Sequence, residues 1–216
     1  MYKSKKNKFI VLIPAYNELI NLKKFVKKVN KFVPVCVLDD CSRDNTHLWL
    51  NRNKILVKRN KYNLGYEKNL LNGIMIYKKY YEYLITFDAD GQHKTSDLKK
   101  ILKFKKLPDI IICNRKNKNR FMEVIISNIF YFFFNLKDPL SGFKVYNSKI
   151  LKKENFKNIG DYFLVDFLLL FLKKTNVVNF EITTKKREDD SRVGGLLSIG
   201  FKEFKILIKI IYKKFY

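Results

Sequence analysis

Short apolar runs alternate with longer amphipathic segments through the first half of the chain. The apolar runs lie at residues 9–13, 33–38, 55–57, 83–87 and 110–113, and each predicts a buried β-strand. Apolar residues recur at helical spacing in residues 17–32. Further helices are predicted after Gly65, ending at about Tyr80, and after Thr95 or Ser96, ending at Lys106. Strands that alternate with helices of this length indicate βαβ crossovers. We therefore predict an α/β fold with a mostly parallel sheet flanked by helices.

The second half of the chain is more apolar and less regular. Its predicted elements are a helix at 121–136, a turn-rich loop at 138–143, a helix at 161–174, a strand at 177–184, a polar loop at 185–195 and a basic amphipathic helix at 199–216. The chain carries neither an internal repeat nor a linker between two domains. We predict one domain over residues 1–196, followed by a C-terminal helix over 197–216.

Composition fits a folded domain with a strong positive charge. The 216 residues are 47% hydrophobic, and 45 Lys and Arg against 20 Asp and Glu leave a net charge of +25. Such a balance favours a polyanionic partner, which is nucleic acid, an anionic membrane surface or a phosphorylated substrate. A lysine-rich solvated surface without any such partner is an equal alternative.

Several classes of protein are excluded at this stage. Cys36, Cys41 and Cys113 form no CxxC pair, and His47 and His93 are isolated, so neither a disulfide framework nor a zinc site is predicted. No apolar stretch approaches the roughly 20 residues of a membrane-spanning helix. We expect free cysteines in a reducing compartment and a chain that does not span a membrane by itself.

Polar clusters follow three predicted strands, at residues 14–18, 39–44 and 88–93. Ligands of such sheets bind at the carboxyl ends of the strands. Asp88 and Asp90 can converge there on one hard cation, with Gln92 as a further oxygen ligand, and such a site suits Mg²⁺ or Mn²⁺. The alternative is a loop whose carboxylates cap turns and the next helix.

Six motifs in this order resemble those of family 2 glycosyltransferases. They are VLIPAYNE at 11–18, LDDCSRDNT at 38–46, NLGY at 63–66, FDADGQH at 87–93, DPLSGFK at 138–144 and SRVGG at 191–195. The last three are similar to the branch that includes dolichyl-phosphate mannose synthase and other polyprenyl-phosphate glycosyltransferases.

The resemblance implies a GT-A (Rossmann-like) fold and metal-dependent transfer of a hexose, with inversion, from a nucleotide-diphosphate sugar. The implied nucleotide-binding residues are Pro14, Tyr16, Glu18, Leu38, Asp40, Asp88, Ala89 and Asp90. The implied Mg²⁺ or Mn²⁺ ligands are Asp88, Asp90 and Gln92, and the implied catalytic residues are Asp88, Asp90, Arg115 and Arg187. Binding of the acceptor and its phosphate is implied for Asp138, Ser141, Arg187, Ser191 and Arg192.

The acceptor decides whether a base is needed. A sugar hydroxyl must lose a proton to a positioned carboxylate, whereas a lipid phosphate is already largely ionised at neutral pH. Asp138 and Asp166 are the carboxylates considered for that role, and a base at either position is the less favoured reading. We predict a GDP-mannose or UDP-glucose type of donor and a polyprenyl or dolichyl phosphate acceptor, with a saccharide hydroxyl in surface-glycan assembly as the alternative.

A lipid acceptor implies a peripheral protein on the cytoplasmic face of a membrane. The aromatic residues of 121–136 and the basic amphipathic segment 201–216 suit a bilayer interface, although the C-terminal helix fits packing on its own domain equally well. A membrane-protein partner is left open. Nucleic acid is not expected as a partner, because no nucleic-acid-binding motif accompanies the charge, and the intact Asp88 and Asp90 argue against an inactive homologue.

Overall fold

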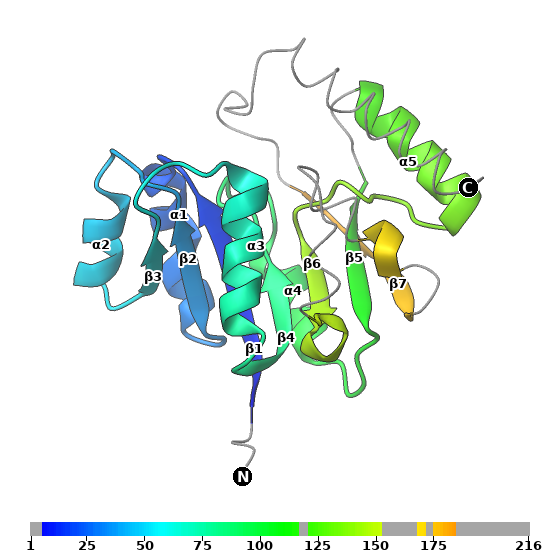
Figure 1. Cartoon of the computed structure of the whole chain (residues 1–216), viewed down its shortest axis with the longest axis horizontal. Helices are drawn as coiled ribbons and strands as arrows, with labels where there is room; N and C mark the ends of the chain where they lie inside the picture. The colour runs from blue at the N-terminus through cyan, green and yellow to red at the C-terminus, as the bar shows by residue number, and fades with distance from the viewer. Residues whose placement is uncertain (1–5, 117–120, 153–167, 172–174, 185–216) are drawn as a thin grey trace.

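A seven-stranded sheet forms the centre of the computed structural model, with helices on both of its faces (Figure 1). The structure describes residues 6–116, 121–152, 168–171 and 175–184. Its elements in chain order are β1 (Asn7–Ala15), α1 (Leu19–Asn30), β2 (Val35–Asp39), α2 (Thr46–Arg52), β3 (Leu56–Arg59), α3 (Tyr66–Tyr77), β4 (Tyr81–Thr86), α4 (Thr95–Leu102), β5 (Ile110–Arg115), α5 (Phe121–Phe134), β6 (Lys144–Asn147), a 3₁₀ turn η1 (Ser148–Ile150) and β7 (Val177–Ile182).

The strands lie in the order β3-β2-β1-β4-β6-β5-β7. All neighbouring strands are parallel except β6, which is antiparallel to both β4 and β5. Leu12 in β1 is in register with Cys36 in β2 and with Thr86 in β4. The carboxyl ends of these three strands therefore meet at one edge of the sheet. The predicted α/β fold with a mostly parallel sheet is confirmed.

Two apolar cores explain why the central strands are apolar without interruption. Successive side chains of a strand point to opposite faces, so Val11 and Ile13 join α1, α2 and α4 on one face. Ile10 and Leu12 join α3 and α5 on the other. A strand covered on both faces needs apolar residues at consecutive positions, and this is the pattern from which the strands were predicted.

Helix α2 and strand β6 were not predicted from the sequence. Helix α2 begins where the Asp44 carboxylate accepts hydrogen bonds from the backbone N–H and the hydroxyl of Thr46. Strand β6 begins with a lysine and is only four residues long, so it lacks the apolar run that marks the other strands. Helices α3 and α4 end at Tyr77 and Leu102, earlier than the predicted 80 and 106.

Part of the sequence prediction lies outside the described residues. The predicted helix 161–174 is described only at 168–171, where it is helical. The loop 185–195, the C-terminal helix 197–216 and Asp166 are outside the described ranges. Within those ranges, no helix combines the length and the apolar character that crossing a membrane requires.

Candidate active site

Hydrogen bonds join the first two polar clusters at the carboxyl ends of β1 and β2. The backbone N–H of Asn17 donates to the Ser42 hydroxyl (2.9 Å), and the N–H of Arg43 donates to the Asn17 side-chain oxygen (2.7 Å). The first N–H of α1, on Leu19, donates to the Asp44 carboxylate (2.9 Å). Asn17 has a φ of 56°, a left-handed conformation that asparagine tolerates better than most residues. The two loops are thus fixed against each other.

Asp40 organises the loop that leads into α3. Its carboxylate accepts hydrogen bonds from the side chain of Asn60 (2.7 Å) and from the backbone N–H groups of Leu64 (2.9 Å) and Gly65 (2.8 Å). Gly65 has a φ of 82°, which a side chain rarely adopts. The buried Asp40 therefore fixes the residue that immediately precedes Tyr66, at the start of α3.

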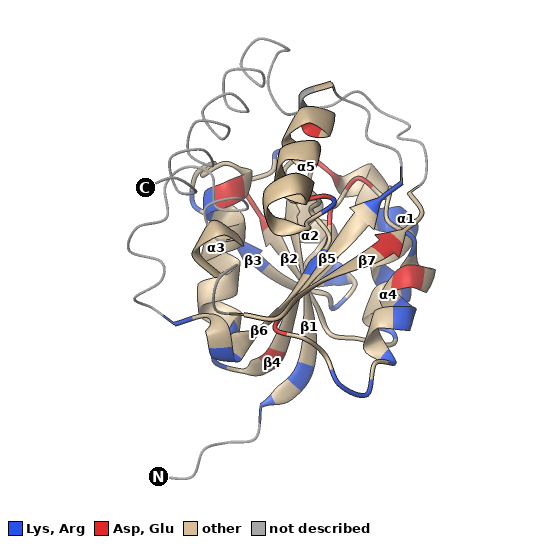
Figure 2. Cartoon of the chain, turned by 90° about the vertical axis from the view of Figure 1, so that its right-hand side faces the viewer, with Lys and Arg blue, Asp and Glu red and all other residues tan. Residues whose placement is uncertain are grey.

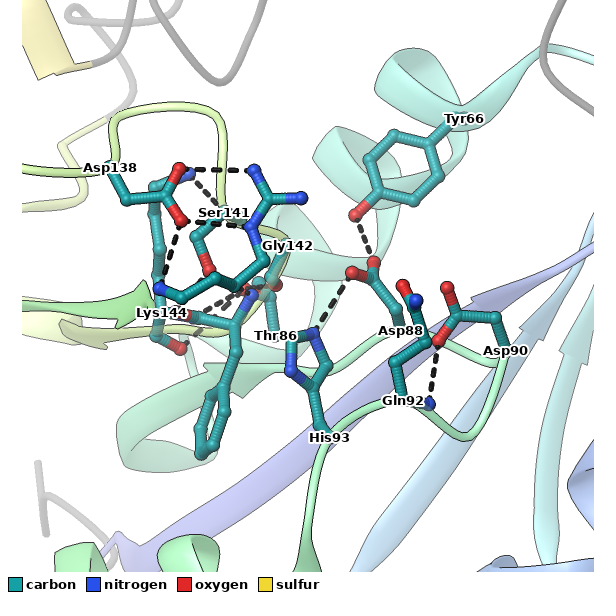
Figure 3. A network of polar contacts seen from close by, with 12 residues as sticks. Tyr66, Thr86, Asp88, Asp90, Gln92, His93, Asp138, Ser141, Gly142 and Lys144 are labelled. Carbon is teal, nitrogen blue, oxygen red and sulfur yellow. Dashed lines mark hydrogen bonds and ion pairs between the residues drawn. The ribbon is translucent and has the colours of Figure 1, made fainter. Parts of the chain in front are cut away.

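Asp88 lies just past β4 and is held from two sides (Figure 3). The Tyr66 hydroxyl donates to one carboxylate oxygen (2.9 Å), and Nε2 of His93 contacts the other (3.0 Å). Burial opposes ionisation of Asp88, but the hydrogen bonds from His93 and Tyr66 hold its pKa below the ordinary value. Burial and the adjacent carboxylate raise the pKa of Tyr66 well above its ordinary value, so its hydroxyl keeps the proton that it donates.

Asp90 and Gln92 stand beside Asp88 on the same loop. The Asp90 carboxylate accepts the backbone N–H of Gln92 (3.0 Å), and Gly91 between them has a φ of 74°. This tight turn brings the Gln92 side chain back between the two carboxylates (Figure 3). No cluster of three or more His, Cys, Asp or Glu side chains suited to a metal occurs in the described part of the chain.

Two carboxylates and one amide nevertheless fit a divalent cation that is bound together with a substrate. Mg²⁺ in nucleotide sites takes one or two protein carboxylates and completes its shell with waters and phosphate oxygens. The two hydrogen bonds to Asp88 occupy one lone pair on each oxygen and leave the others for a ligand. The donor set of Asp88, Asp90 and Gln92 is thus adequate for Mg²⁺ or Mn²⁺ on a diphosphate.

The loop 138–143 packs against this cluster. The Thr86 hydroxyl donates to the Gly142 carbonyl (2.7 Å) and accepts from the N–H of Lys144 (3.1 Å). A methyl group added at Gly142 would overlap the Asp88 carboxylate. Glycine is therefore required here by a close approach of the loop to Asp88, and not by an unusual backbone angle.

Arg115 forms a bidentate ion pair with Asp138, the first residue of this loop. Nε and Nη2 of Arg115 donate to the two carboxylate oxygens at 2.8 and 3.1 Å, and its backbone N–H adds a third bond (3.0 Å). Asp138 is fully buried, whereas the Arg115 side chain is 18% exposed and also lies 3.4 Å from Glu123. The guanidinium is thus held rigidly with one side toward solvent.

Lys144 is the fully buried cation of this region. Its ammonium donates to the Ser141 carbonyl (2.5 Å). Burial lowers the pKa of Lys144 to about 8, although the charges of Asp138, Glu67 and Asp88 oppose the shift. The lysine therefore ties β6 to the loop that faces Asp88.

The remaining predicted site residues differ in accessibility. Pro14, Leu38, Ala89 and Ser141 are buried, so their contribution to a ligand site is limited to backbone atoms or shape. Tyr16 is 39% exposed, and Glu18 accepts a hydrogen bond from Asn21 (2.8 Å). Arg187, Ser191 and Arg192 lie outside the described residues.

Two open clefts flank this region. One, of about 530 Å³, is lined by Asn17, Leu19, Ile20 and Asp44, next to the predicted nucleotide contacts Tyr16 and Glu18. The other, of about 410 Å³, lies along β3 and α3 and includes Leu38 but neither Asp88 nor Asp90. We place the candidate site at the strand ends, where the carboxylates lie, and not in this second cleft.

The structure also adds three residues that sequence reasoning missed. Tyr66, His93 and Lys144 each stand inside a quoted motif, but their contacts cross between distant segments. The signal for Lys144 was a lysine in the middle of an otherwise apolar stretch, 143–146.

Comparison with known proteins identifies the family of the chain. The family model described as glycosyl transferase family 2 matches residues 10–171. An undecaprenyl-phosphate mannosyltransferase of Micrococcus luteus is 29% identical over 50% of this chain and 48% of its own length. A UDP-N-acetylglucosamine–dolichyl-phosphate N-acetylglucosaminyltransferase of Methanococcus voltae is 25% identical over 93% of this chain and 94% of its own length.

A solved structure supports the fold. Glucosyl-3-phosphoglycerate synthase from Mycobacterium tuberculosis, crystallised with Mn²⁺, UDP and phosphoglyceric acid, superposes with a TM-score of 0.74. The two chains are 13% identical, and the match covers 96% of this chain and 78% of the other. The chain is a glycosyltransferase that belongs to family 2, and it resembles the family's polyprenyl-phosphate branch.

Proposed function

We propose that the protein transfers a hexose, with inversion and in a metal-dependent reaction, from a nucleotide-diphosphate sugar to a polyprenyl or dolichyl phosphate. The observation that carries the proposal is the cluster of Asp88, Asp90 and Gln92 at the carboxyl end of β4. This cluster lies where open α/β sheets bind their ligands. The donor is of the GDP-mannose or UDP-glucose type.

The donor diphosphate would lie over the end of β4. Asp88, Asp90 and Gln92 would hold Mg²⁺ or Mn²⁺ there, and the bound cation would neutralise the charge that develops on the leaving diphosphate. The loops after β1 and β2, which are fixed to each other by Asn17, Ser42 and Asp44, would bind the nucleoside. Tyr16, Glu18 and the backbone around Leu38 and Asp40 are the contacts that we assign to it.

The burial and pairing of Asp138 support a phosphate acceptor. Asp138, the carboxylate considered earlier as a base, is buried and occupied by three donors from Arg115. A lipid phosphate needs no proton removed before attack, and it requires a cation to hold it. The partly exposed Arg115 is the residue of the described chain to which we assign this role, with Arg187 and Arg192 as further candidates.

Helix α5 supports the use of a membrane-bound acceptor. Phe121, Val124, Tyr131 and Phe132 recur at helical spacing on one face and are 79%, 40%, 53% and 83% exposed. Ile126 and Phe130 on the opposite face are buried. An aromatic helix face of this kind suits the interfacial region of a bilayer, so we propose peripheral attachment to the cytoplasmic face of a membrane.

Donor binding and sugar transfer can be tested in two successive experiments. Thermal unfolding is measured with UDP or GDP, each with and without Mn²⁺, because a ligand of the native state raises its stability. The matching nucleotide sugar is then incubated with a short polyprenyl phosphate or with an oligosaccharide, and products are identified by mass spectrometry. We expect a glycosyl phosphate lipid, with a loss of at least about 100-fold in Asp90→Asn. Transfer to the oligosaccharide alone would replace the proposed acceptor by the saccharide hydroxyl.

A further inference from the structure

Two segments far apart in the sequence meet at the carboxylate of Asp88. Tyr66 is the first residue of α3, and His93 lies in the loop between β4 and α4. Each donates to a different oxygen of Asp88, at 2.9 and 3.0 Å, and Gly142 closes a third side. The carboxylate is therefore fixed in position without any ligand (Figure 3).

The two donors are themselves fixed. The His93 side chain is 2% exposed, and its ring packs edge-on against Phe87 and Phe143, with centroids 5.2 and 5.3 Å away. The backbone of His93 is bridged to Thr184, just after β7. On the other side, Gly65 donates to Asp40, which holds the start of α3 and hence Tyr66.

The hydrogen bonds also specify which proton His93 carries. Nε2 faces the Asp88 oxygen and therefore bears the hydrogen, while buried Nδ1 has no hydrogen-bond partner within the described residues. His93 is thus built as a donor toward Asp88, and its burial leaves it no direct route to the substrate.

We propose that Tyr66 and His93 are positioning residues that hold Asp88 in the orientation required for binding the metal and donor diphosphate. The inference rests on the proposed function, and it assigns a role to two residues that the proposed function does not use. Partners that orient a metal ligand typically change metal affinity by 10- to 100-fold when they are removed. Through Asp40 and Gly65, Tyr66 also links the loop after β2 to the metal-binding loop.

The test measures Mn²⁺ affinity, in the presence of UDP or GDP, for wild-type protein and three variants. Tyr66→Phe removes the hydroxyl, His93→Phe keeps a ring in the aromatic packing but removes the donor, and His93→Gln keeps a donor. We expect the Mn²⁺ dissociation constant to rise about tenfold in the two Phe variants and less in His93→Gln. Nucleotide affinity without metal should stay unchanged.

Tyr77→Phe is the matched control, because it deletes a hydroxyl from the same helix that contacts Cys36 and not Asp88. Metal-free thermal unfolding shows whether each variant is folded. Wild-type affinity for Mn²⁺ in folded Tyr66→Phe and His93→Phe would overturn the inference and leave the proposed function standing. Failure of the wild-type protein to bind Mn²⁺ with either nucleotide would overturn both.

Discussion

The charged residues below the site are stabilised to very different degrees. Asp138 is fully buried, but Arg115 donates a hydrogen bond to each of its two carboxylate oxygens. Lys144 is equally buried, and the one hydrogen bond described for its ammonium is to the Ser141 carbonyl. A buried ammonium without a directly bonded carboxylate is costly to keep charged. The protein thus buries a cation that has no directly bonded carboxylate among the described residues next to an anion that is fully paired.

Lys144 should therefore make stability depend on pH. Its pKa is about 8 in the folded protein, against an ordinary value of 10.5, so between these values the unfolded chain binds more protons and a rise in pH favours folding. Relative to Lys144→Met, the wild-type free energy of unfolding should rise by about 2 kcal/mol from about pH 7.5 to 9.5. Urea unfolding of both proteins at the two pH values measures it. Parallel behaviour of the two would show that the lysine titrates normally.

Gly142 is the residue at which shape alone controls the site. In Gly142→Ala the new methyl group would collide with Asp88, which Tyr66 and His93 prevent from moving freely. We expect transferase activity to fall by at least about tenfold, while overpacking costs about 1–3 kcal/mol of stability. Activity and thermal unfolding are measured on the same preparation. Full activity would mean that Asp88 can shift without harm.

At the scale of elements, the apolar pattern predicted the strands that are covered on both faces of the sheet. It failed for the two elements whose formation depends on a contact with another segment. The strands β1, β2, β4 and β5 are recognisable because each is buried on both faces. Strand β6 begins at Lys144, whose burial depends on the neighbouring loop and not on its own polarity. Helix α2 starts from a side-chain contact by Asp44. Both depend on tertiary contacts that a local pattern does not contain.

The site was predictable to the extent that it is contiguous. Asp88, Asp90 and Gln92 lie within five residues and were assigned together from a single motif. Tyr66 is 22 residues away from Asp88 in sequence, and their contact arises because α3 runs antiparallel to the strands, so that its first residue lies at their carboxyl ends. The contacts of Asp40 were likewise not evident from its motif, because its carboxylate accepts hydrogen bonds from Asn60, Leu64 and Gly65. Its assignment to the nucleotide stays a prediction.

Helix α5 allows the membrane proposal to be tested at a single position. Phe132 is 83% exposed, whereas Phe130 two residues earlier is buried. Replacing Phe132 by Ser removes an exposed aromatic without touching the core, and an inserted aromatic side chain contributes roughly 1.5–3 kcal/mol when fully buried. Sedimentation with phospholipid vesicles should show binding at least about fivefold weaker than wild type. Equal sedimentation would direct attention to other surfaces.

The exposed lysines of α1 and the exposed aromatics of α5 lie on different sides of the sheet. Exposed lysines line α1, at Lys23, Lys24, Lys27 and Lys28 (Figure 2), and α1 packs on the face opposite to α3 and α5. Exposed charges interact only weakly with charges more than a Debye length away, about 8 Å at physiological salt. The net charge of +25 is therefore a poor guide to where a bilayer would be contacted.

Replacing these four lysines by Gln separates the two influences. If α5 is the docking element, the variant should bind anionic vesicles within about twofold of wild type at physiological salt, because α1 lies behind the sheet and its charges are screened. Vesicle sedimentation at that salt concentration compares it with Phe132→Ser, and far-UV circular dichroism checks that α1 is intact. A loss of binding as large as that in Phe132→Ser would show that charge over the whole molecule governs attachment. Unchanged binding of the lysine variant together with a weakened Phe132→Ser would assign attachment to α5, at the same edge of the sheet as the candidate site (Figure 1).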